Sequence, residues 1–341
     1  MYHPFTYPEA LVIGLVQGVT ELFPISSLGH SVIIPALVGG SWAQDLNVSE
    51  AESPYLAFIV GLHVATAAAM ILYFWRDWRR IITGFFGSVA HVVSPAEGTR
   101  RFEPQTTEQR LAWMIILATI PVGLAGLLLE HDFRVYFSKP VLASIFLAIN
   151  GLILFSGEAV RRRRSGLDSQ QSVDDRQMAA VGGAGSPGTA RHSSRQRALK
   201  QQEASLAVQA DKRLVGVGWL SAFGLGASQI LALLPGISRD GTVMVCGMFR
   251  GLSRQDAARF SFLLSAPVIL AAGVLKIPDL TGPLGSGVRG QVLAGSVVSF
   301  VAAYLALRFL MRYFAQNRPL TPFAVYCLIA GIGSAIYLGI T

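Results

Sequence analysis

The chain has 341 residues, of which 52% are hydrophobic and only 14% are charged. A soluble domain usually carries about 25% charged residues, so this composition excludes an ordinary water-soluble protein. Several apolar runs approach the roughly 20 residues needed to cross the hydrocarbon core of a bilayer. The composition therefore predicts a polytopic α-helical membrane protein. Its net charge of +8 is explained by cationic cytoplasmic loops, and no nucleic-acid partner is expected.

In chain order, the first distinctive stretch is residues 14–31, GLVQGVTELFPISSLGHS, a polar cluster inside an apolar run. Gln17 and Glu21 are four residues apart, so both side chains lie on one face if the segment is helical. Pro24 lacks an N–H and is expected to end or break that helix. The polar residues after the break are Ser26, Ser27, Gly29 and His30. Because polar groups are expensive inside a bilayer, the cluster predicts a functional site; a surface helix with a polar cap is the alternative.

Six apolar segments are predicted to span the membrane, three in each half of the chain. They are residues 55–75, 111–129, 141–160, 259–276, 289–310 and 320–340. The first span is followed by RDWRR and the third by four arginines, so both of these ends are expected in the cytoplasm. Residues 81–110, between the first two spans, are predicted to form an interfacial helix and a loop.

Residues 161–213 differ from the rest of the chain, because Gln, Ser, Gly and charged residues dominate there. Eleven Lys and Arg against five Asp and Glu give this segment a net charge of +6. It is predicted to be a basic, mostly disordered cytoplasmic linker that is attracted to anionic lipid. The linker separates a first membrane repeat, residues 1–160, from a second, residues 214–341.

The two halves begin alike. Each opens with a Gly-rich apolar stretch that is broken at a proline and followed by a serine-containing loop: GLVQGVTELFPISS in the first half and GLGASQILALLPGISR in the second. If both stretches are re-entrant, the cationic loops make the first enter from outside and the second from inside, so the halves are inverted copies whose breaks meet near the midplane. The predicted fold is an all-α polytopic membrane protein with six transmembrane helices plus two re-entrant helix-loop-helix segments in inverted repeats. Both termini are expected outside and the linker inside.

The second break, PGISRDGT at residues 235–242, forms a second polar cluster. A guanidinium at membrane depth needs an anion, and the donors around Arg239 suit phosphate, whose oxygens accept several hydrogen bonds at once. The residues expected to bind phosphate beside it are Gly236, Ser238, Asp240 and Thr242. In the alternative interpretation, Arg239 only pairs with Asp240 or Glu21 to hold a helix break. Together the two clusters supply an anion clamp, hydroxyl nucleophiles, a histidine and a carboxylate, which are the groups that phosphoryl transfer requires.

On these residues the chain resembles the undecaprenyl-diphosphate phosphatase family, also called the bacitracin-resistance family. Gln17 and Glu21 match the family's first signature (Glu or Gln, three residues, then Glu), and PISSLGH follows it. PGISR at residues 235–239 matches the second signature, PGxSR. Stretches such as GLHVATAAAMILYFWRD and GLSRQDAARFSFLLSAPVILAAG are also similar. The resemblance therefore covers nearly all of the chain outside residues 161–213.

Three positions depart from the family pattern. Gln17 stands where the family commonly has a second carboxylate, which weakens a two-carboxylate metal site. Asp240 replaces the usual serine after the Ser-Arg pair. Val243 stands where the family's threonine normally falls, and Thr242 is one position early.

The resemblance implies that the chain hydrolyses undecaprenyl diphosphate to undecaprenyl phosphate and phosphate. The reaction would take place at the outer face of a bacterial plasma membrane, where it recycles the lipid carrier of peptidoglycan synthesis and confers resistance to bacitracin. A polyprenyl diphosphate and membrane lipids are then the expected partners, and a homodimer is left open.

The resemblance also implies roles for the site residues. Ser27 would attack the terminal phosphate, His30 would serve as general base and then acid, and Arg239 would hold the oxygens. Glu21 would bind a divalent cation, Mg²⁺ or Ca²⁺, or orient His30; attack by His30 itself is an open variant. The expected substrate-binding residues are Gln17, Ser26, Gly236, Ser238, Asp240 and Thr242. His63, inside the first span, is interpreted as a packing or hydrogen-bonded residue.

Two other classes of protein are consistent with parts of the pattern. Inverted repeats with broken helices are common in transporters, and a polyprenyl-phosphate flippase would need the same anion clamp. Phosphate release by the purified protein separates these two functions. An acid-phosphatase-type lipid phosphatase is disfavoured, because that group has a histidine five residues after a Ser-Arg pair and no histidine follows Ser238 here.

Overall fold

The computed structural model describes residues 5–46, 54–93, 104–137, 139–178, 208–281 and 287–340, and all regular structure in these ranges is helical. The helices of the first half are α1 (Tyr7–Thr20), α2 (Ser27–Val38), α3 (Gly40–Asp45), α4 (Pro54–Tyr73), α5 (Trp75–Val93), α6 (Thr107–Phe137) and α7 (Pro140–Met178). Those of the second half are a short helix at Val208–Gly216, α9 (Trp219–Ser228), the 3-10 helix η1 (Gln229–Leu233), α10 (Arg239–Phe249), α11 (Arg254–Thr281), α12 (Arg289–Ala315) and α13 (Thr321–Ile340).

Five helices are each long and apolar enough to cross a membrane: α6, α7, α11, α12 and α13. The sixth predicted span is α4, which meets this criterion together with α5 across a bend of 85°. The bend turns α5 away from the direction of α4, as expected for the interfacial helix, although α5 starts at Trp75 rather than at residue 81. The prediction of a polytopic, all-helical membrane protein is confirmed.

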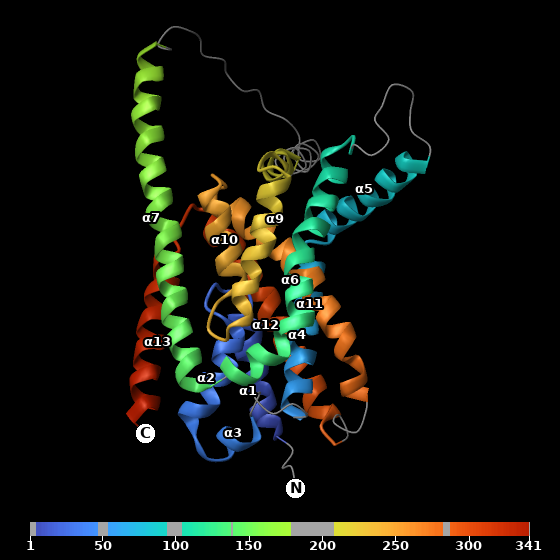
Figure 1. Cartoon of the computed structure of the whole chain (residues 1–341), viewed down its shortest axis with the longest axis vertical. Helices are drawn as coiled ribbons and strands as arrows, with labels where there is room; N and C mark the ends of the chain where they lie inside the picture. The colour runs from blue at the N-terminus through green and yellow to red at the C-terminus, as the bar shows by residue number, and fades with distance from the viewer. Residues whose placement is uncertain are drawn as a thin grey trace, which may run out of the picture.

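The two proline-broken stretches form two broken helices, as predicted. In the first, α1 and α2 are separated by residues 21–26; in the second, η1 and α10 are separated by residues 234–238. Figure 1 shows α1 to α3 at the same end of the molecule as both termini, whereas α5 and the far end of α7 lie at the opposite end. The first broken helix packs against α12 and the second against α6, so each half covers the other. This exchange is the contact pattern of inverted repeats.

Small residues allow α1 to lie unusually close to α12. A Cβ atom added to Gly14 would come within 2.5 Å of the carbonyl oxygen of Gly295, and one added to Gly18 would meet the carbonyl of Ser299 as closely. In lipid, which is as apolar as leucine, such close backbone packing replaces hydrophobic burial as the main cause of helix association. It fixes the end of α1, where Gln17 and the residues of the break follow.

The prediction of a disordered linker is wrong at both ends of residues 161–213. α7 continues to Met178, and the short helix at Val208–Gly216 is docked on the membrane domain. Asp211 of this helix is buried and lies 3.1 Å from Arg80 and 2.6 Å from Arg259. Composition indicated a polar segment, but it could not show that Asp211 forms ion pairs with Arg80 and Arg259 of other helices. Residues 179–207 lie outside the described residues.

Candidate active site

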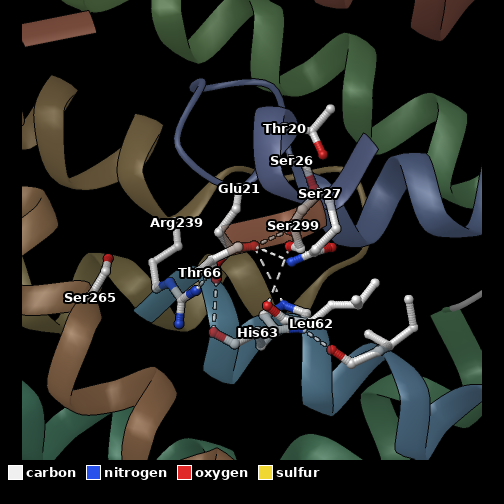
Figure 2. Close-up of polar contacts among 12 residues, drawn as sticks. Thr20, Glu21, Ser26, Ser27, Leu62, His63, Thr66, Arg239, Ser265 and Ser299 are labelled. Carbon is white, nitrogen blue, oxygen red and sulfur yellow. Dashed lines mark hydrogen bonds and ion pairs between the residues drawn. The ribbon is translucent and has the colours of Figure 1, made fainter. Parts of the chain in front are cut away.

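Four side chains from four helices converge on the carboxylate of Glu21, which is buried where α1 breaks. Its Oε1 lies 2.5 Å from Nη2 of Arg239, the first residue of α10. Its Oε2 accepts hydrogen bonds from Nε2 of Gln17, at 2.9 Å, and from the hydroxyl of Ser27. The same Oε2 lies 3.4 Å from Nε2 of His63 on α4. Figure 2 shows Ser27, His63 and Arg239 around Glu21, so the two sequence clusters form one site.

Arg239 has donors to spare for a ligand. Its side chain is 20% exposed, against 3% for the side chain of Glu21, so the guanidinium lies toward the open part of the site. Its Nε is buried and makes no hydrogen bond within the described part of the chain. The exposed part of the guanidinium can donate to an anion while Nη2 stays paired with Glu21.

The two breaks touch each other through Ser26. The hydroxyl of Ser26 accepts hydrogen bonds from the backbone N–H of Gly29, at 3.3 Å, and of Gly236 in the other half, at 3.1 Å. Ser26 has φ +69°, a left-handed conformation that costs a non-glycine residue energy and persists only where its surroundings hold it. Gly236 has φ +112°, and a Cβ there would overlap the backbone of α7. The junction therefore requires glycine on one side and a strained serine on the other.

Both helices that leave the breaks start with a serine cap. Ser26 caps α2 through Gly29, and Ser238 caps α10 by accepting the N–H of Gly241 at 3.1 Å. Helix N-termini carry partial positive charge and unpaired N–H groups, which favour anions. Because the Ser26–Gly236 bond brings the two breaks together, the site combines two such termini with Arg239.

Asn150 of α7 also joins the breaks, and the sequence reasoning missed it. Its Nδ2 donates to the carbonyl of Pro24 at 2.9 Å, and its Oδ1 accepts from the N–H of Ser238 at 3.0 Å. The side chain is completely buried. An amide inside an apolar span was the available signal, since a polar residue at membrane depth needs partners.

His30 was predicted to be the general base for Ser27. In the structure its two ring nitrogens have other partners. Nδ1 lies 2.7 Å from the carbonyl oxygen of Ser26, and Nε2 lies 2.7 Å from the hydroxyl of Tyr326 on α13. A carbonyl can only accept, so Nδ1 carries the hydrogen and Nε2 accepts from the tyrosine. Ser27 donates to Glu21 instead. In this geometry His30 supports the strained backbone of Ser26, and its role as general base stays a prediction.

Two predicted phosphate ligands also turn away from the cluster. The Oδ1 of Asp240 accepts from the hydroxyls of Ser261 and Ser265 of α11, both at 2.6 Å. The hydroxyl of Thr242 donates to the carbonyl of Arg239 in its own helix at 2.8 Å. In the ligand-free chain these contacts brace α10, and the substrate-binding role of both side chains stays a prediction. The acid that pairs with Arg239 is Glu21.

The residues of the site do not fit a resident divalent cation. Among the described residues, no three His, Cys, Asp or Glu side chains are grouped to hold one. Both oxygens of Glu21 already accept hydrogen bonds or ion pairs, and one of them is 2.5 Å from a guanidinium. The remaining oxygen is Oε1 of Gln17, which is buried without a partner in the described chain. Mg²⁺ and Ca²⁺ prefer several carboxylate or carbonyl ligands. The expected cation stays a prediction.

Fold and site together define a polytopic membrane protein with a buried polar site at the junction of its two broken helices. The family model described as "Bacitracin resistance protein BacA" matches residues 10–333, and the chain belongs to this family. It is 54% identical to the "Undecaprenyl-diphosphatase" of Mycolicibacterium paratuberculosis, with 98% of each chain aligned. It is 48% identical to "Undecaprenyl-diphosphatase 1" of Frankia casuarinae, with 98% of this chain and 99% of the relative aligned. The resemblance seen in the sequence is confirmed.

Proposed function

We propose that the protein is an integral membrane phosphatase that hydrolyses undecaprenyl diphosphate to undecaprenyl phosphate and phosphate. The observation that carries this proposal is the continuous contact from the Ser27 hydroxyl through the Glu21 carboxylate to the Arg239 guanidinium. These are a nucleophile, a base and an anion clamp, in the order that phosphoryl transfer needs. The names and full-length alignment of the relatives support the same substrate.

In the first step Ser27 attacks the terminal phosphorus. Its O–H proton passes to Oε2 of Glu21, to which it is already hydrogen-bonded. The freed electron pair forms the Ser–O–P bond, the anhydride P–O bond breaks, and undecaprenyl phosphate leaves with that bond's electrons. Glu21 passes that proton on and is ionised again before the second step. Water then attacks the phosphoserine and gives a proton to Glu21, and the departing serine oxygen takes this proton from Glu21. Phosphate is the second product.

Arg239 neutralises the charge of the phosphate oxygens during both steps. In the free protein it pairs with Glu21 at 2.5 Å. When Glu21 takes the proton of Ser27, its carboxylate becomes neutral and the ion pair with Arg239 is lost. The guanidinium keeps its positive charge and can turn fully to the transferring phosphoryl group. Stabilisation of charge that develops only in the transition state is the type of interaction that raises turnover.

We place the site toward the outer face of the membrane. The first broken helix lies at the end that carries both termini, whereas α5, which begins with Arg76, Arg79 and Arg80, lies at the opposite end, which we take as cytoplasmic (Figure 1). A product released there is undecaprenyl phosphate in the outer leaflet, ready to be returned as the carrier of cell-wall precursors. The apolar helix surfaces can face the prenyl tail while the diphosphate enters the polar junction.

A flippase for polyprenyl phosphate is the second candidate, because inverted repeats with broken helices are common in transporters. The test is phosphate release from undecaprenyl diphosphate by the protein purified in detergent, with Ser27→Ala as the control. A phosphatase releases one phosphate per substrate, and the serine variant loses this activity. Lipid binding without phosphate release would support the flippase. In sealed right-side-out vesicles, phosphate should appear in the external medium.

A further inference from the structure

His63 is placed at the reacting groups, although its position inside the first span indicated a packing role. Its Nδ1 lies 2.8 Å from the carbonyl oxygen of Ile59, one helical turn earlier in α4. Because the carbonyl can only accept, the hydrogen of the neutral ring is on Nδ1. The lone pair of Nε2 therefore faces Oε2 of Glu21, the same oxygen that accepts the hydroxyl of Ser27. Figure 2 shows the ring beside Glu21.

The position of His63 is fixed by α12. The hydroxyl of Ser299, which is completely buried, donates to the carbonyl of Leu62 at 3.5 Å. Gly18 of α1 also packs closely against the backbone carbonyl of Ser299. One turn of α12 thus holds both the turn of α4 that carries His63 and the end of α1 that carries Glu21.

The exposure of these groups increases from Glu21 to His63. The side chain of Glu21 is 3% exposed and that of His63 is 24% exposed. A proton that Ser27 gives to Glu21 is therefore inside the protein, 3.4 Å from Nε2 of the more exposed His63. The other site histidine, His30, has no such route, because it is buried and both nitrogens are bonded to protein oxygens.

We infer that His63 is the proton-transfer residue of the reaction. The proton of Ser27 moves to Oε2 of Glu21 as the Ser–O–P bond forms, and then to Nε2 of His63, which becomes an imidazolium. Glu21 is thereby an ionised base again when water attacks the phosphoserine. The proton of that water passes through Glu21 to the departing serine oxygen, and the imidazolium releases its proton to solvent or to the product phosphate. The inference rests on the proposed hydrolysis, since it describes the proton path of that reaction.

Chemical rescue tests the inference. His63→Ala should lower turnover about 10²-fold or more, the usual effect of losing a positioned acid–base group. Added imidazole should raise the turnover of His63→Ala at least tenfold, because the side chain that is removed is partly exposed, at 24%. His30→Ala is the matched control: its cavity is closed, and imidazole should not restore it. No rescue of His63→Ala at any imidazole concentration overturns the inference.

His63→Gln distinguishes proton transfer from support of Glu21. A glutamine amide can still donate a hydrogen bond to the carboxylate, so a supporting role predicts near wild-type turnover, and that result would also overturn the inference. We expect a melting temperature close to that of the wild type with turnover as low as in His63→Ala. All variants are compared with an active wild-type protein; if the wild type itself releases no phosphate, it is the proposed hydrolysis that fails, independently of His63.

Discussion

Replacing Arg239 separates its role in the reaction from its role in holding the two halves together. In the structure Arg239 and Glu21 form an ion pair between residues that are 218 positions apart in the chain. Arg239→Ala leaves the Glu21 carboxylate, with its 3% exposed side chain, without this counter-charge. Breaking a buried pair by removing one partner typically costs about 3–5 kcal/mol. Because Gln17 and Ser27 still donate to Glu21, we expect the lower end, about 3 kcal/mol of unfolding free energy.

Arg239→Lys should behave differently. The ammonium keeps a charge beside Glu21, so the melting temperature should stay close to that of the wild type. It cannot reproduce the planar fork whose Nε is unpaired in the free protein, so phosphate is held at fewer points. The expected loss is about 3 kcal/mol of transition-state stabilisation, or roughly 100-fold in turnover.

The assays are phosphate release and thermal unfolding of the same detergent preparations. Arg239→Ala combined with Glu21→Gln should recover much of the lost stability, because the unpaired charge is gone, but should recover no activity. Wild-type turnover in Arg239→Lys would refute the clamp. A double variant that is no more stable than Arg239→Ala would refute the buried ion pair.

Two further variants test other parts of the site. Gln17→Glu should fold and should become more sensitive to a chelator than the wild type, because two carboxylates one helical turn apart repel unless a cation neutralises them; equal chelator sensitivity in both proteins contradicts this. Asn150→Leu removes both hydrogen bonds that join the breaks and leaves a buried N–H and a buried C=O unpaired, at about 1–3 kcal/mol each, so both melting temperature and turnover should fall. Ser144→Ala is its control, since Ser144 is equally buried on α7 but bonds the carbonyl of Pro140 in its own helix; an equal effect of the two changes would deny Asn150 its bridging role.

The parts of this molecule that could be predicted are those with a local signal. Apolar length gave the spans, proline gave the breaks, and the four-residue spacing placed Gln17 beside Glu21, where a hydrogen bond joins them. The inverted repeats followed from the distribution of arginines. The meeting of Glu21 and Arg239 also followed, because two breaks at the midplane of inverted halves have to face each other.

The parts that could not be predicted depend on which helices pack together. His63 reaches Glu21 only because α12 holds α1 and α4 in register through backbone contacts at Gly18 and Leu62. His30 has a suitable residue type and position, but its ring is taken by a tyrosine 296 residues away. Asp240 directly follows the second signature, and only the fold shows that it binds serines of α11. Sequence spacing has no information about such partners.

The ion pair at the centre of the site can form only late in the synthesis of the chain, because its two residues are far apart in the sequence. Glu21 enters the membrane with the first residues of the chain, and its guanidinium partner is 218 residues behind. At about 5–20 residues per second, the ribosome needs roughly 10–40 s to reach Arg239. During that time the first half holds a carboxylate at membrane depth without its arginine, so it has to stay protonated or in contact with water. The ion pair can form only after the second re-entrant segment has inserted, so the catalytic centre cannot be completed while only the first half of the chain has been made.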